Sequence, residues 1–316
     1  MIAAFVFASA VTAAACAADP TVESRKRAAE LPIADMHFHI VPHMTPRDLL
    51  AQMDRNNVRW AGAVGPVWMG LPVDAFIDRM GARYVAMAGQ PDFLMMLRSV
   101  GAGGLTDADN PTFTAMMAQA EKDFAAGRIH GFGELFLNNM NSSPDMSFRR
   151  KTSADSATVR QMFAMAARFS AVVQIHMEPE QGSVDALEAV MARFPTVPVI
   201  LSHCMAVTAS PSFPESFLRA HPQAYCDLSA RAEPVMSSFS RRLMIYGPTF
   251  ADDRWVALME ALPDRFVLGS DLTDPSLSYD KIIANMRTGL LPRLSAATAR
   301  KVAYENAVAL FKLPMR

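Results

Sequence analysis

Short apolar segments recur along the chain, and most of them end abruptly at a polar or ionisable residue. They are rich in Val, Ile, Ala and Phe at consecutive positions, a pattern typical of parallel strands that are covered on both faces. The first segment contains the sequence Asp-Met-His-Phe-His at 35–39. The others lie at 58–64, 84–88, 128–136, 171–175, 197–201, 224–228 and 265–268. The pattern therefore predicts eight strands.

Segments with helical spacing separate these strands, and several begin with a helix-capping residue. These signals are Thr45 before Pro46, Asn110 before Pro111, Ser183 and Ser295. Regular alternation of strand and helix favours a (β/α)8 TIM barrel of the α/β class over an open doubly wound sheet. No glycine-rich dinucleotide turn follows any of the predicted strands, which agrees with this choice.

Two imidazoles stand two residues apart on the first predicted strand. Because strand side chains alternate between faces, His37 and His39 point to the same side and can converge on one cation. Four further ionisable residues lie where later strands end: Glu134, His176, His203 and Asp271. In a TIM barrel these strand ends meet at the face that carries the chemistry. We therefore predict that the six side chains form one metal site.

The sequence Asp-x-His-x-His at 35–39, together with His176, His203 and Asp271, resembles the ligand pattern of the amidohydrolase superfamily of metal-dependent hydrolases. Residues 305–311, Glu-Asn-Ala-Val-Ala-Leu-Phe, resemble the closing helix of the amidohydrolase-2 branch, which includes aminocarboxymuconate-semialdehyde decarboxylase and several lactonases. The resemblance covers nearly all of the chain after its N-terminal segment. It implies a TIM-barrel enzyme and leaves the substrate open.

The resemblance also implies a role for each residue. The first metal would be bound by His37, His39, His176 and Asp271, and Asp271 would also carry the proton. His203 would bind a second metal or act as a catalytic side chain. Where many binuclear members have a carboxylated lysine, this chain has Glu134, which resembles the bridging ligand of TatD-like enzymes and would complete a second position with His203. One and two metal ions both stay open, as does a merely structural Glu134.

Imidazoles and carboxylates suit Zn²⁺, with Mn²⁺ or Fe²⁺ as alternatives. A bound metal lowers the pKa of water from ~15.7 toward ~7, and Asp271 can accept the released proton. We therefore predict a hydrolase that cleaves an amide, lactone or ester bond of a small molecule with metal-activated water. One alternative is a non-oxidative decarboxylase of an aromatic or unsaturated carboxylic acid at the same site. Another, of a different class, is a barrel that binds metal or ligand without turnover.

Two residues near strand ends are candidates for binding the substrate. Arg231 follows the seventh strand and can pair with a substrate carboxylate, although most loop arginines are solvated. Trp68 follows the second strand and is a candidate wall of the pocket, with loop packing as the alternative.

Composition agrees with one enzyme domain. The chain has 316 residues, 51% of them hydrophobic, and a net charge of −1 without a basic run. This charge pattern lacks the basic cluster typical of nucleic-acid binding, so the expected partner is a small-molecule substrate. We assign residues 19–316 to the barrel, expect no stable membrane span, and leave a homo-oligomer open.

Residues 1–18 form an apolar, alanine-rich segment without a charge, and they predict a signal peptide that is cleaved near Ala17 or Ala18. The segment is short for a membrane span. It implies a periplasmic or secreted protein, although it lacks the usual positive start. Lipid attachment at Cys16 is the alternative.

Two cysteines, Cys204 and Cys226, remain after such a cleavage. We expect them to be buried free thiols, because a barrel of this size does not require a disulfide for stability.

Overall fold

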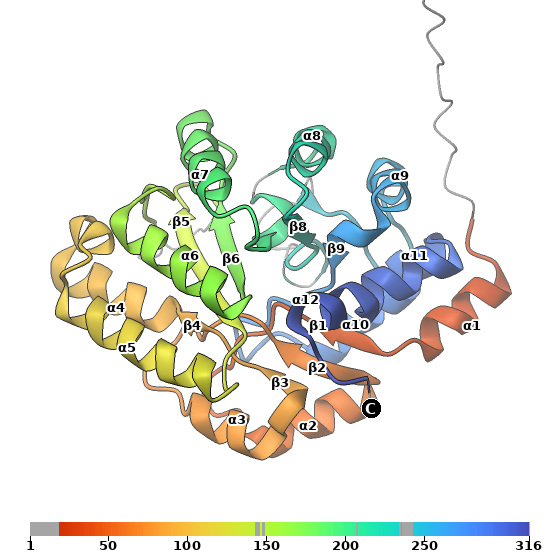
Figure 1. Cartoon of the computed structure of the whole chain (residues 1–316). Coiled ribbons are helices and arrows are strands. Elements are labelled where there is room, and N and C mark those ends of the chain that lie inside the picture. Colours follow the sequence, from red (N-terminus) through yellow and green to blue (C-terminus); the bar gives the residue numbers. More distant parts are fainter. Residues whose placement is uncertain are drawn as a thin grey trace, which may run out of the picture.

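A computed structural model of the chain describes residues 19–142, 146, 149–206, 208–233, 235 and 243–315. The predicted signal segment, 1–18, and its Cys16 therefore lie outside the described residues. Helices form a ring around a central set of strands (Figure 1). Within the described ranges, no helix combines the length and the apolar character that crossing a bilayer requires.

The described strands are all paired in parallel with their neighbours. They are β1 (Ile33–Asp35), β2 (Val58–Gly62), β3 (Tyr84–Val85), β4 (Ala88–Gly89), β5 (Gly131–Asn138), β6 (Val172–Met177), β7 (Val199–Leu201), β8 (Ala224–Asp227) and β9 (Phe266–Val267). Their order follows the sequence in two groups, β1 to β3 and β4 to β9. Because β3 and β4 are the two ends of the strand predicted at 84–88, the eight predicted strands are confirmed.

The first and last strands join and close the barrel. Two parallel bridges connect them, Asp35 with Leu268 and Phe38 with Leu272. Just beyond these strands, the Asp271 amide donates to the His37 carbonyl at 2.7 Å. We call this junction the closing seam. The predicted (β/α)8 barrel is confirmed, and the seam holds three predicted site residues side by side.

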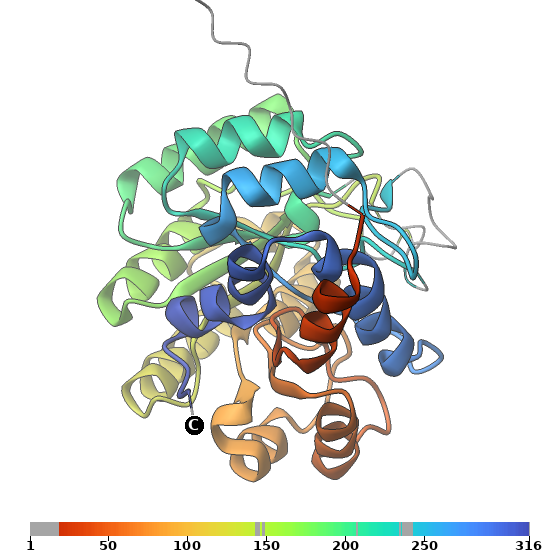
Figure 2. The same cartoon turned by 90° about the vertical axis from the view of Figure 1, so that its right-hand side faces the viewer.

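The helices lie between the strands along the chain and outside them in space (Figure 1). They are α1 (Val22–Glu30), α2 (Pro46–Arg55), α3 (Val73–Met80), α4 (Gln90–Val100), α5 (Pro111–Ala125), α6 (Ala157–Phe169), α7 (Gln181–Arg193), α8 (Ser212–Ala220), α9 (Asp253–Ala261), α10 (Tyr279–Asn285), α11 (Ala296–Arg300) and α12 (Asn306–Phe311). Figure 2 shows α1 beside the helices of the chain's C-terminal part. There the Arg287 guanidinium donates to the Ala28 carbonyl at 2.7 Å.

Most of the predicted helix starts are confirmed by a side-chain cap. Thr45 forms a reciprocal capping box with Asp48, and Asn110 and Ser295 cap α5 and α11. The start predicted at Ser183 is wrong, because α7 begins two residues earlier at Gln181. Its N-cap residue is Glu180, whose carboxylate accepts a hydrogen bond from the Ser183 hydroxyl at 3.3 Å.

An apolar cluster fills the barrel away from the predicted site. Its members come from successive strands and from the C-terminal segment, and they include Ala34, Trp60, Val85, Val172, Ile200, Val267, Phe311 and Leu313. A packed interior of this kind makes the barrel a solid core and not a pore.

Cys204 and Cys226 form a disulfide, with their Cα atoms 4.5 Å apart. The expectation of free thiols is therefore wrong. Its cause is register: Leu201 pairs with Cys226 across β7 and β8, so the turn after β7 brings Cys204 to the neighbouring strand. Sequence spacing alone does not reveal such a register.

Gly269, next to the closing seam, leaves no room for a side chain. An added Cβ would lie 2.4 Å from the His37 Cβ and 2.8 Å from the Ser229 Cβ. We expect Gly269→Ala to lower the free energy of unfolding by about 1–3 kcal/mol, the usual cost of overpacking. Gly182→Ala is the control, because Gly182 is an exposed residue of α7 with no atom within 4 Å of its added Cβ. Chemical denaturation measures both, and equal stability of the two variants would contradict the packing described.

Candidate metal centre

The six side chains predicted to form a site come together in one cluster. His37 and His39 follow β1, His176 lies in β6, His203 follows β7, and Asp271 follows β9. Glu134 lies within β5, which continues to Asn138 and does not end near Glu134 as predicted. The cluster is shielded from solvent: the Glu134 side chain is 1% exposed and that of Asp271, the most exposed member, 13%.

Four donor atoms in this cluster have the spacing of a tetrahedral metal site. They are the two Nε2 atoms of His37 and His39, Oε2 of Glu134 and Oδ1 of Asp271. The five separations that involve an imidazole run from 3.2 to 3.6 Å. Ligands about 2.0–2.1 Å from a tetrahedral zinc lie about 3.3–3.4 Å from one another. We call these four residues the first ligand set, and a divalent ion fits among them.

A second set meets the other oxygen of the same glutamate. Glu134 Oε1 lies 2.9 Å from His176 Nδ1 and 3.4 Å from His203 Nε2. We expected His176 to belong to the first ligand set. Glu134 occupies that place instead, and His176 lies on the other side of the Glu134 carboxylate. The donor atoms of His37, His39 and Glu134 are close enough to share an ion, and so are those of Glu134, His176 and His203. Metal binding by the six residues stays a prediction, and the geometry offers two positions joined by Glu134.

Asp227, which the sequence analysis did not select, positions two of the histidines. Its Oδ2 lies 2.8 Å from His37 Nδ1, and its Oδ1 accepts the backbone N–H of His203 at 3.2 Å. Its carboxylate is fully buried and ends β8. The strand-end position that singled out the other ligands also applies to Asp227, so the signal was present in the sequence.

Outer hydrogen bonds fix which imidazole nitrogen is free. His39 Nδ1 lies 2.7 Å from the Gly65 carbonyl, which only accepts, so Nδ1 carries the hydrogen and Nε2 keeps its lone pair for a cation. The carboxylate of Asp227 imposes the same arrangement on His37. Such partners hold ligating rings in the required tautomer and orientation.

Charge in the cluster favours binding of a cation. Burial alone would lower the pKa of His37, but in the absence of a metal the carboxylates of Glu134 and Asp227 hold it well above its ordinary value, so a metal at Nε2 would displace a proton. Burial would raise the pKa of Glu134, yet His37 and the hydrogen bonds from the imidazoles hold it well below its usual range. The pKa of Asp271 is also lowered, against the effect of burial, by hydrogen bonds to His37 and His39. Buried carboxylates thus stay ionised and attract a divalent ion.

The two predicted substrate-binding residues are placed differently. Arg231 is buried and not solvated: it donates to the Thr208 carbonyl and lies over the Trp255 ring at 5.3 Å. Trp68 is exposed, and its indole N–H donates at 3.1 Å to the carbonyl of Thr273, close to Asp271 in the chain. Trp68 therefore joins the loop after β2 to the loop after β9 near the cluster. Substrate binding by either residue stays a prediction.

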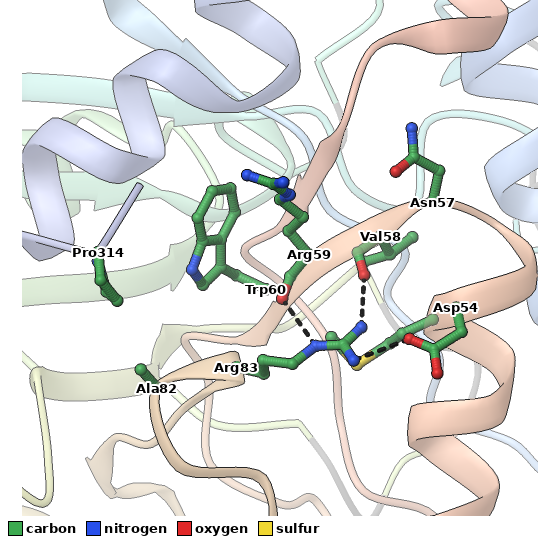
Figure 3. Close-up of a pocket in the computed structure, with 9 residues that line it drawn as sticks. Asp54, Asn57, Val58, Arg59, Trp60, Ala82, Arg83 and Pro314 are labelled. Carbon is green, nitrogen blue, oxygen red and sulfur yellow. Dashed lines mark hydrogen bonds and ion pairs between the residues drawn. The ribbon is translucent and has the colours of Figure 1, made fainter. Parts of the chain in front are cut away.

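A pocket of about 320 Å³ lies at the opposite end of the strands, where β2 begins (Figure 3). The Arg83 guanidinium crosses it and donates to the Asp54 carboxylate at 2.8 Å and to the Val58 carbonyl at 3.0 Å. Because this guanidinium is already paired within the protein, we assign no chemistry to the pocket.

Histidines and carboxylates gathered at one end of a closed parallel barrel define a metal-dependent enzyme of the TIM-barrel class. The sequence matches the amidohydrolase family over residues 34–313, and the chain belongs to this family. The predicted resemblance is therefore confirmed. No curated protein sequence matches the chain.

Several solved structures share the fold over most of their length. An amidohydrolase from Burkholderia multivorans with bound zinc is 19% identical, with a TM-score of 0.54, and the match covers 86% of this chain and 89% of that one. The 2,6-dihydroxybenzoate decarboxylase from Rhizobium is 12% identical (TM-score 0.55; 89% and 98% covered). A probable 2-pyrone-4,6-dicarboxylic acid hydrolase from Acinetobacter baumannii, with citric acid bound, is 14% identical (TM-score 0.55; 89% and 100% covered).

The shared carboxylate of Glu134 leads to a prediction about metal content. We expect zinc-saturated protein to bind two equivalents and Glu134→Gln to bind fewer, because the variant loses the anion common to both ligand sets. Mass-spectrometric metal analysis after removal of free zinc measures this. Glu215→Gln is the control, since Glu215 is half-buried on α8 and pairs with Arg219. One equivalent in both wild type and Glu134→Gln would favour a mononuclear site.

Proposed function

We propose that the chain is a metal-dependent hydrolase that cleaves an amide, lactone or ester bond of a small molecule. The observation that carries this proposal is the position of Asp271. Its Oδ1 lies 3.4 Å from His37 Nε2 and 3.5 Å from His39 Nε2, and it is the most exposed group of the cluster. A carboxylate at the boundary between metal ligands and solvent can take a proton from water and deliver it to a leaving group.

The side chains have distinct duties in this proposal. When bound, a divalent ion, for which zinc is the best candidate, supplies Lewis acidity that polarises a carbonyl and lowers the pKa of water. Asp271 accepts and returns the proton at Oδ2, the oxygen outside the first ligand set. His203 faces the cluster with Nε2 and is fixed from behind, because its Nδ1 lies 2.8 Å from the Ser229 hydroxyl. A barrel that merely stores metal would need the histidines but not a partly exposed Asp271.

A non-oxidative decarboxylase of an aromatic or unsaturated acid is the second candidate. It is supported by the fold shared with 2,6-dihydroxybenzoate decarboxylases. A panel of lactones, esters, amides and aromatic acids, assayed for acid release and for CO₂, separates the two reactions. Absence of turnover on every class would contradict both and favour a binding barrel.

The role of Asp271 is tested by Asp271→Asn. We expect this variant to keep its fold and most of its metal while turnover falls by about 10²–10⁴, the usual contribution of general acid–base assistance. The exposed Asp274, three residues later, provides the matched control Asp274→Asn, which should retain its activity. Near-normal turnover of Asp271→Asn on the identified substrate would refute the proton-carrier role.

We also propose that the protein is exported to the periplasm or secreted. The disulfide between Cys204 and Cys226 supports this, because disulfides persist in oxidising compartments and are rare in the cytosol.

Export predicts a processed chain. Protein isolated from its native compartment should begin near Ala18 or Asp19 and carry no lipid, as intact-mass measurement would show. An acylated Cys16 would establish lipid anchoring instead, and an unprocessed Met1 in the cytoplasm would contradict export.

A further inference from the structure

Arg150 is a cation buried inside the protein. The residue is 3% exposed. Within the described part of the chain, none of its three guanidinium nitrogens makes a hydrogen bond. The arginine at 287 shows the usual arrangement in this protein, since its guanidinium donates to several backbone carbonyls. A buried charge left unpaired destabilises a protein, so Arg150 calls for an explanation.

The backbone fixes Arg150 at the end of the barrel that carries the metal ligands. Its carbonyl accepts the Asn139 N–H at 2.9 Å, just beyond the end of β5. Its guanidinium carbon lies 4.6 Å from the centre of the Phe136 ring. That ring lies 4.7 Å from the imidazole of His176. One aromatic ring therefore separates the guanidinium from a predicted metal ligand.

The charge on Arg150 is not neutralised by its surroundings. Burial lowers its pKa to about 10, with Glu134 raising and Arg98 lowering it, so the group stays charged at neutral pH. Glu134 is already engaged by the imidazoles on both of its oxygens. Arg98 adds a second positive charge, and its guanidinium donates to the sulfur of Met69 at 3.1 Å. This corner of the site favours an anion.

We infer that Arg150 binds the carboxylate of the substrate, and that the substrate is therefore a small organic acid that binds at this corner of the site, beside Phe136. A planar guanidinium offers two parallel N–H groups that match a carboxylate. The Phe136 ring provides an apolar surface for the rest of the molecule. This inference rests on the proposed function for the site but holds for hydrolysis and decarboxylation alike.

Binding of benzoate and of its neutral analogue benzamide tests the inference without turnover. Calorimetry on zinc-loaded protein should show that wild type prefers benzoate, and that Arg150→Met weakens benzoate binding by about 10- to 100-fold, as expected for a lost charged hydrogen bond. Arg149→Met, at the exposed neighbouring arginine, should bind like wild type. Three results would overturn the inference. Wild type could bind benzoate no more tightly than benzamide, Arg150→Met could bind benzoate as wild type does, or wild type could bind inorganic phosphate more tightly than benzoate.

Thermal unfolding supplies a second, independent test. Removal of an unpaired buried charge should stabilise the protein, so we expect the Tm of Arg150→Met to rise by about 2–4 °C, whereas Arg149→Met should leave it unchanged. A fall in Tm would show a structural role and overturn the inference. If Arg150→Met does not fold, the same benzoate measurement on Arg150→Lys decides. Lysine keeps the positive charge but lacks the two parallel N–H groups of the guanidinium, so this variant should bind benzoate less tightly than wild type. Normal benzoate binding without turnover would refute the proposed function alone.

Discussion

One buried carboxylate, that of Glu134, connects the two halves of the site. Its two oxygens face different pairs of imidazoles, His37 with His39 and His176 with His203. Four rings packed this closely in the protein interior would, when protonated, repel one another and any metal ion without a negative charge among them. Burial of Glu134 is tolerated because every side of the carboxylate meets a donor. The arrangement of the surrounding strands follows from the need to hold these groups in place.

The protein treats its buried charges in two ways. Asp35 illustrates the first: it is fully buried, and it accepts hydrogen bonds from the Ser270 amide and the Tyr279 hydroxyl, which partly offset the effect of burial, although its pKa still rises to about 6. Arg150 illustrates the second, since its guanidinium makes no hydrogen bond within the described ranges of the chain. Polar groups that are satisfied support the fold, whereas an unsatisfied one at the edge of a site costs stability and is available to a ligand.

The fold and most of the clustered site residues could be predicted from the sequence, because strand ends are visible as breaks in apolar runs. That rule located the barrel and the six clustered side chains, including His176 and His203. It did not predict which oxygen of Glu134 each histidine would face, because that depends on register and side-chain rotamers. The disulfide at Cys204 was missed for the same reason, and Arg150 because its burial follows from a segment folding back along the end of β5. Local patterns carry periodicity but not the contacts between distant segments.

The closing seam has a consequence for how the protein is made. His37 and His39 leave the ribosome early, whereas Asp271, whose amide bonds to the His37 carbonyl, follows more than two hundred residues later. Strand pairing between such distant segments waits until the whole barrel is available. A nascent or truncated chain therefore offers a metal only scattered histidines, and the complete first ligand set exists only once synthesis has passed the last strand. Loading with the proposed metal is in this way tied to completion of the chain.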